Sequence, residues 1–140
     1  MMIEKTRESL IADYARECIG TPFIHQGRLI GKGLDCAGVL RHVLERMGLP
    51  CLDDKGYPSK PFDGMLNKIM DAEPSLKRVE NSELMPGDVC VFRVTKAPQH
   101  IAIYTGDTVI HAYADTGRVV EQSYSAWAKN LTAVYRIIHE

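Results

Sequence analysis

The stretch Gly33-Leu34-Asp35-Cys36-Ala37-Gly38 contains a cysteine at the point where a glycine-rich loop gives way to an amphipathic helix. The first-turn N–H groups of a helix carry partial positive charge, which favours thiolate over thiol and can lower the pKa of a cysteine below its free value of about 8.5. Cys36 is therefore the candidate nucleophile. Asp35 suits the N-cap of this helix, and a contact to a substrate amine is an equally open role for its carboxylate.

The residues that follow Cys36 predict a helix with one buried side. Its apolar positions recur at helical spacing and are Cys36, Val39, Leu40, Val43, Leu44 and Met47. Gly48 and Pro50 then end the pattern. A structural role for Cys36 is the alternative, because the first position of an apolar stripe also suits a core cysteine.

The rest of the chain divides into a mainly helical first half and a β-rich second half. A first amphipathic helix is predicted around Leu10 to Cys18, followed by an aperiodic loop over residues 20–34. Residues 51–61 are expected to form a surface loop, Phe62 to Met70 a short helix and Leu76 to Glu80 an edge strand. The remaining strands are predicted over Asp88 to Val94, Ile101 to Thr105, Val109 to Tyr113, Arg118 to Ser123 and Ala133 to Ile138.

The segment from His100 to His111 predicts a β-hairpin that brings two histidines together. If Gly106 and Asp107 form a two-residue turn, the two residue numbers of each cross-strand pair sum to 213. Ala102 then lies opposite His111. His100 is then the diagonal neighbour of His111 on one face, close enough for one ring to take a thiol proton while the other fixes its tautomer. The other face holds an apolar layer of Ile101, Ile103, Ile110 and Ala112. A three-residue turn would separate the two rings.

The composition is that of one globular domain over residues 1–140, with 45% hydrophobic and 25% charged residues. The net charge is -1 and no basic stripe occurs, so nucleic acid is not expected as a partner. The N-terminal residues lack the pattern of an export signal, and no apolar run reaches the roughly 18 residues of a membrane span. We expect a protein made in the cytoplasm without membrane insertion.

The four cysteines, at positions 18, 36, 51 and 90, include no C-x-x-C pair, which argues against a zinc site and a disulfide framework. We expect free thiols, no metal and no other cofactor. Cys18 and Cys90 fit core patterns and are interpreted as structural, whereas Cys51 is interpreted as a surface thiol without a base nearby. His42 is expected to be solvated, and His139 to lie idle in the tail.

Five short motifs occur in order along the chain: Gly20-Thr21-Pro22-Phe23, Asp35-Cys36-Ala37-Gly38, Met85-Pro86-Gly87-Asp88-Val89, His100-Ile101-Ala102-Ile103-Tyr104 and His111-Ala112. Together they resemble the NlpC-type cell-wall cysteine peptidases. The resemblance implies a papain-like α+β fold, in which the nucleophile helix packs on a small antiparallel sheet that carries both histidines. It also implies Cys36 as nucleophile, His100 as general base and His111 as the residue that orients this base.

Two positions depart from the family pattern. The residue after the nucleophile is often serine in the family and is Ala37 here, which predicts a different specificity. The aromatic residue of the preceding loop is commonly a tyrosine that helps stabilise the oxyanion, whereas Phe23 cannot donate a hydrogen bond. The loss of one oxyanion donor costs roughly 10²–10³ in rate, and His25 or Gln26 are the candidates to replace it. The predicted substrate side of the site comprises Asp35, Phe23, His25, Gln26 and Ala37.

The sequence thus predicts a cysteine peptidase or amidase. The resemblance implies a peptidoglycan stem peptide as substrate, cut at the amide between D-glutamate and a diamino acid. A single domain without an export signal resembles the phage-tail and prophage members, which implies phage-tail proteins as partners and delivery to the cell wall in a particle. Two alternatives stay open: an acyltransferase of the same fold, and a structural tail or adaptor protein that has kept the fold without turnover.

Overall fold

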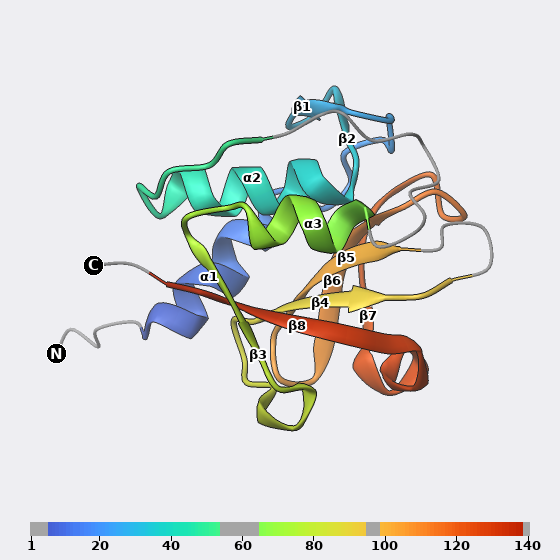
Figure 1. The fold of residues 1–140 in the computed structure, drawn as a ribbon. Helices are drawn as coiled ribbons and strands as arrows, with labels where there is room; N and C mark the ends of the chain where they lie inside the picture. Colours follow the sequence, from blue (N-terminus) through green and yellow to red (C-terminus); the bar gives the residue numbers. More distant parts are fainter. Residues whose placement is uncertain (1–5, 54–64, 95–98, 139–140) are drawn as a thin grey trace, which may run out of the picture.

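The computed structural model describes residues 6–53, 65–94 and 99–138. Its helices are α1 (Arg7–Arg16), α2 (Cys36–Arg46) and α3 (Met65–Asp71), which lie together beside a six-stranded sheet (Figure 1). The strands of the sheet are β3 (Leu76–Val79), β4 (Val89–Phe92), β5 (His100–Tyr104), β6 (Thr108–Tyr113), β7 (Arg118–Ser123) and β8 (Leu131–Ile137). They are arranged in the order β3-β8-β4-β5-β6-β7, and each neighbouring pair is antiparallel.

The two faces of the sheet pack against different partners. One face joins the helices in the main core, where Val39 and Val43 of α2 lie in the same cluster as Ile101 and Ile103 of β5. The opposite face is covered by the segment between β7 and β8, which contributes the buried Trp127. None of the helices in the described part of the chain is both long and apolar enough to cross a bilayer.

The β5–β6 hairpin has the register that places both histidines on one face. Ile103 pairs with Ile110 and Tyr104 with Val109, and each pair of residue numbers sums to 213. The two-residue turn works because Gly106 has a φ of 114°, a conformation that side chains disfavour. The predicted apolar layer is confirmed as part of the helix-side core and comprises Ile101, Ile103, Ile110 and Ala112.

Several element boundaries differ from the sequence prediction. Helix α1 begins three residues before Leu10, because the Thr6 side chain accepts a hydrogen bond from the Ser9 N–H and caps it. Residues 20–34 are not wholly irregular: strands β1 (Arg28–Leu29) and β2 (Gly33–Leu34) form a short hairpin beyond the start of α2 (Figure 1). The predicted edge strand is confirmed as β3, while the predictions for residues 54–64 and His139 lie outside the described residues.

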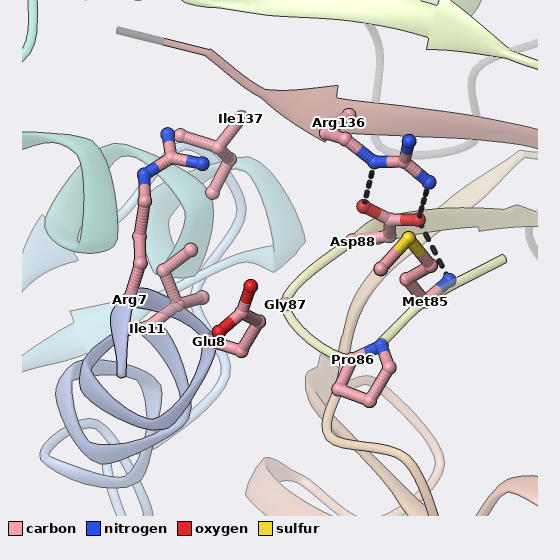
Figure 2. Close-up of a pocket in the computed structure, with 9 residues that line it drawn as sticks. All are labelled: Arg7, Glu8, Ile11, Met85, Pro86, Gly87, Asp88, Arg136 and Ile137. Atoms are coloured by element: carbon pink, nitrogen blue, oxygen red, sulfur yellow. Dashed lines mark hydrogen bonds and ion pairs between the residues drawn. The ribbon is translucent and has the colours of Figure 1, made fainter. Parts of the chain in front are cut away.

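The Met85–Asp88 motif has a structural role in the turn before β4. The Asp88 carboxylate accepts two hydrogen bonds from the Arg136 guanidinium at 3.0 and 2.9 Å, and a third from the Met85 N–H at 2.9 Å (Figure 2). Gly87 has a φ of 93° and donates its N–H to the Tyr104 carbonyl at 2.7 Å. A cavity of about 50 Å³ is lined by residues of this turn, of α1 and of β8. The motif therefore fixes β4 and β8 relative to the β5–β6 hairpin rather than supplying a reactive group.

Candidate active site

Asp35 begins helix α2 and ties the preceding loop to it. Its Oδ1 accepts the Gly38 N–H at 2.8 Å, which makes it the N-cap residue. The same oxygen accepts a hydrogen bond from Arg28 Nη1 at 2.8 Å, and Oδ2 accepts the Gln26 N–H at 2.8 Å. Since these contacts occupy both carboxylate oxygens, the structure favours the capping role over a contact to a substrate amine.

Close backbone contact explains the glycines on either side of the cysteine. A Cβ on Gly38 would overlap the Gly27 carbonyl oxygen, and one on Gly27 would lie 2.5 Å from the backbone of Gly33. Real Cβ atoms do not approach backbone atoms so closely. The β1–β2 hairpin can therefore pack against the first turn of α2 only with glycine at these positions.

We expect Asp35→Ala to lower the free energy of unfolding by about 3 kcal/mol. It removes the helix cap and leaves Arg28, whose side chain is 8% exposed, without one of its carboxylate partners. Asp35→Asn keeps an oxygen for the Gly38 N–H and should lose clearly less. Urea unfolding of the three proteins measures both losses, and equal losses for alanine and asparagine would contradict the capping role.

The Cys36 thiol is half-buried at the beginning of β5. Its Sγ accepts hydrogen bonds from the backbone N–H groups of Ile101 and Ala37, so the sulfur lies against the first peptide of the strand that His100 begins. Within the described residues, no hydrogen bond joins Sγ to the His100 ring. The structure thus brings the sulfur to the backbone of His100, in a residue that is half-buried as a whole.

The expectation of a lowered pKa for Cys36 is wrong in this structure. Burial raises the pKa of the thiol to about 12, and the negative charge of Asp35 acts in the same direction. The two backbone N–H groups and the Arg28 charge favour the thiolate but are outweighed. The isolated protein therefore holds a neutral thiol, because packing against β5 removes the solvation that a thiolate needs.

We expect iodoacetamide to alkylate Cys36 more slowly at pH 7 than it alkylates cysteine in an unstructured peptide. The rate should climb only through the alkaline range, since burial keeps the sulfur protonated. Mass spectrometry of digested protein measures the rate at this position, and Cys51→Ala serves as a control that removes the other half-buried thiol. Fast alkylation that levels off below pH 7 would reveal a stabilised thiolate and contradict the structure.

The two histidines lie in direct contact on the face opposite the helices. His100 Nε2 and His111 Nδ1 are 2.5 Å apart and share a hydrogen bond. The His111 ring stacks on Tyr113 with 5.3 Å between centroids, and its edge meets Trp127 at 4.9 Å. Strand register and these aromatic walls hold the pair in one geometry, as the hairpin prediction requires.

Both imidazoles are neutral near pH 7. Burial lowers the pKa of His111 to about 4, although the hydrogen bond to Gln122 opposes this shift. Burial and the neighbouring His111 hold the pKa of His100 well below its usual range. A neutral ring has one protonated and one unprotonated nitrogen, so each ring can donate one hydrogen bond and accept another.

Acidification should destabilise the fold through His111. Its pKa is about 4 in the folded protein and 6.5 in the unfolded chain, so only the unfolded state gains a proton between these values. The stabilisation is present above pH 6.5 and is lost as the pH falls toward 4. We expect His111 to contribute about 2 kcal/mol to the stability lost between pH 7 and pH 5 in urea unfolding, in addition to the contribution of His100. His111→Gln should reduce this slope, and an unchanged slope would contradict a buried neutral ring.

The other predicted substrate-side residues lie in the loop beside the start of α2. Phe23 is half-buried against the main core and pairs with Leu34, while His25 is exposed. Gln26 has a φ of 60°, a strained conformation for this residue, and its N–H is the one held by Asp35. Ala37 is half-buried in the first turn of α2. Asp35 therefore connects the loop that carries His25 and Gln26 to the first turn of α2.

Two residues beside the histidines were missed in the sequence. Gln122 Oε1 lies 2.8 Å from His111 Nε2, and Trp127 Nε1 donates to the same oxygen at 3.1 Å. The only sequence signal was the position of Gln122 in the strand that follows His111. Its register with β6, where Val109 pairs with Gln122, makes it the diagonal neighbour of His111.

The other cysteines and His42 lie in settings that the structure describes. Cys18 and Cys90 are buried, as predicted. Cys51 is half-buried, and its Sγ donates to Glu73 Oε2 at 3.5 Å, so the expectation of a surface thiol was wrong. His42 is likewise not simply solvated, because its Nε2 lies 2.8 Å from Glu17 Oε1. Within the described ranges, no group of three or more potential metal ligands is found.

Comparison with known proteins identifies the family. A sequence profile of the NlpC/P60 family matches residues 20–136. The chain belongs to the NlpC/P60 family. Its fold is the papain-like α+β fold of that family, with helix α2, which begins at Cys36, packed on an antiparallel sheet as expected. No curated protein matches the sequence at a significant level.

Solved structures of NlpC/P60 proteins share this fold at low sequence identity. The NlpC/p60 domain of the peptidoglycan hydrolase SagA is 22% identical, with a TM-score of 0.64 over 96% of this chain and 100% of that chain. The peptidoglycan hydrolase RipB of Mycobacterium tuberculosis is 20% identical, with a TM-score of 0.66 over 95% of this chain and 65% of that chain. RipD of the same organism is a non-catalytic NlpC/p60 domain protein adapted to peptidoglycan binding. It is 15% identical, with a TM-score of 0.63 over 97% of this chain and 100% of that chain.

Proposed function

We propose that this NlpC/P60 protein is a cysteine peptidase that hydrolyses an amide bond in the stem peptide of peptidoglycan. The observation that carries the proposal is the hydrogen bond from the Ile101 N–H to the Cys36 sulfur, because the preceding residue of β5 is His100, whose ring is hydrogen-bonded to His111. A thiol next to a base that is oriented by a third group is the arrangement used for nucleophilic catalysis.

In this proposal the proton leaves sulfur as the carbon–sulfur bond forms. Cys36 is a thiol and His100 is neutral, so a thiolate–imidazolium pair is scarcely populated before substrate binds. The sulfur attacks the amide carbonyl while Nδ1 of His100 accepts its proton. That proton passes to the leaving amine, and water then resolves the thioester with His100 again acting as base. His111 holds the His100 ring in place throughout.

In this chain the site lacks one hydrogen-bond donor that the family pattern provides for the oxyanion. Phe23 offers no O–H group, so the first donor in the proposal is the Cys36 N–H, which a helix cannot satisfy within its own first turn. His25 and Gln26 lie on the loop that Asp35 ties to this turn and are proposed as the second donor. Ala37 in place of serine leaves a less polar wall next to the substrate.

Finer parts of the proposal come from the sequence resemblance alone. These are the amide between D-glutamate and a diamino acid as the bond cut, and delivery to the cell wall by a phage tail with tail proteins as partners. Phe23 favours one alternative, a structural tail or adaptor protein that keeps the fold but catalyses no reaction. RipD is a precedent, because it is a non-catalytic NlpC/p60 domain protein.

Incubation with purified peptidoglycan fragments, followed by mass spectrometry, tests the proposal. We expect the wild type to release stem-peptide products, and Cys36→Ala to release none above background. His100→Ala should lose at least about 10²-fold in rate because it removes the general base. Cys51→Ala is the matched control, since this thiol is half-buried but bonds to Glu73.

The outcomes separate the alternatives. Products that carry an added amine, when a competing amine is supplied, would indicate an acyltransferase. Binding of the fragments without cleavage at any pH from 5 to 9 would overturn the peptidase proposal in favour of a binding protein. Equal cleavage by the wild type and by Cys36→Ala would show that another residue carries the activity.

A further inference from the structure

The hydrogen-bond chain of the two histidines continues through Gln122 to Trp127. His111 Nε2 lies 2.8 Å from Gln122 Oε1, and Trp127 Nε1 donates to that oxygen at 3.1 Å. Trp127 is 9% exposed and its ring also packs against Phe92, with 5.4 Å between centroids. The chain of contacts therefore ends on a buried side chain whose ring is held on several sides.

Trp127 determines which way the Gln122 amide points. An indole N–H can only donate, so the Gln122 atom beside it must be the oxygen. With the amide reversed, the NH₂ group would face the indole N–H, and two donors would oppose each other in a buried position. The oxygen has two lone pairs and can accept from Trp127 and from His111 at once.

The orientation of Gln122 then sets the protons on both rings. Because its oxygen accepts, His111 must carry its proton on Nε2, which leaves Nδ1 of the neutral ring as an acceptor. His111 Nδ1 is the atom that contacts His100 Nε2, so the His100 proton lies on Nε2. His100 consequently keeps an unprotonated Nδ1.

We propose that Gln122 and Trp127 are positioning residues that fix the tautomers of His111 and His100, so that Nδ1 of His100 is ready to accept the Cys36 proton. The catalytic consequence rests on the proposed function, whereas the tautomers themselves do not depend on turnover. Trp127 packs its ring against His100, with 5.7 Å between centroids, but its N–H is donated to Gln122, and Gln122 contacts His111.

Trp127→Phe is the variant that isolates this role. It keeps an aromatic ring against Phe92 and Tyr113 but removes the N–H that orients the amide. The amide can then reverse and donate to His111 Nε2, which allows a proton on His111 Nδ1. That proton would be donated to His100 Nε2 and would force the His100 proton onto Nδ1, where it blocks transfer from the thiol.

Nitrogen-15 NMR of histidine-labelled protein reads the tautomers directly, because protonated and unprotonated ring nitrogens have well-separated shifts. Resonances are assigned with His100→Gln and His111→Gln. At pH 7.5 we expect both rings of the wild type to be protonated on Nε2 only. Trp127→Phe should show a mixture of tautomers at both rings, and its kcat on peptidoglycan fragments should fall about three- to tenfold at unchanged KM, as for the loss of one hydrogen bond.

A rescue variant distinguishes this role from packing. A carboxylate cannot donate, so Gln122→Glu in the Trp127→Phe background should restore the Nε2 tautomers and most of the lost kcat. A purely structural role for Trp127 would not be rescued in this way. Three results would each overturn the proposal: a wild-type His111 protonated on Nδ1, wild-type tautomers in Trp127→Phe, or tautomers that glutamate does not restore.

If the tautomers are as proposed but the protein cleaves nothing, the proposed peptidase is refuted and the positioning role stays intact.

Discussion

The position of the candidate nucleophile depends on the hydrogen bonds that the Asp35 carboxylate accepts. It caps α2 through the Gly38 N–H, pairs with Arg28 and holds the Gln26 backbone, so the helix start and the preceding loop form one unit. Cys36 is the next residue, and its sulfur can reach β5 only if the helix begins there. The glycine contacts that bring the loop onto the helix serve the same constraint.

The sheet supplies the second half of the site through register. The two-residue turn at Gly106 and Asp107 places His100 and His111 on the face away from the helices, where they meet aromatic side chains instead of solvent. Burial keeps both rings neutral and also keeps the Cys36 sulfur protonated. In the proposed reaction the proton is therefore transferred during attack rather than from a standing ion pair, and the ring tautomers matter more than the resting charges.

Sequence reasoning succeeded where local periodicity or turn chemistry decides the structure. The start of α2 follows from the Asp35 cap and the apolar stripe after Cys36, and the histidine pairing follows from counting faces across one turn. It failed where distant segments determine the environment. The pKa of Cys36 depends on packing against β5, and the Glu73 partner of Cys51 comes from 22 residues away. Trp127 reaches the histidines from the segment between β7 and β8, which no pattern in the chain signals.

The central claim is that the Cys36 sulfur and the His100 ring act on one carbonyl carbon. A crystal structure with a stem-peptide aldehyde tests it most directly, because an aldehyde forms a hemithioacetal with a nucleophilic thiol. We predict a covalent bond from Cys36 Sγ to the aldehyde carbon, with Nδ1 of His100 facing that sulfur. An aldehyde bonded to another cysteine, or bonded to Cys36 with the His100 ring turned away from it, would contradict the account.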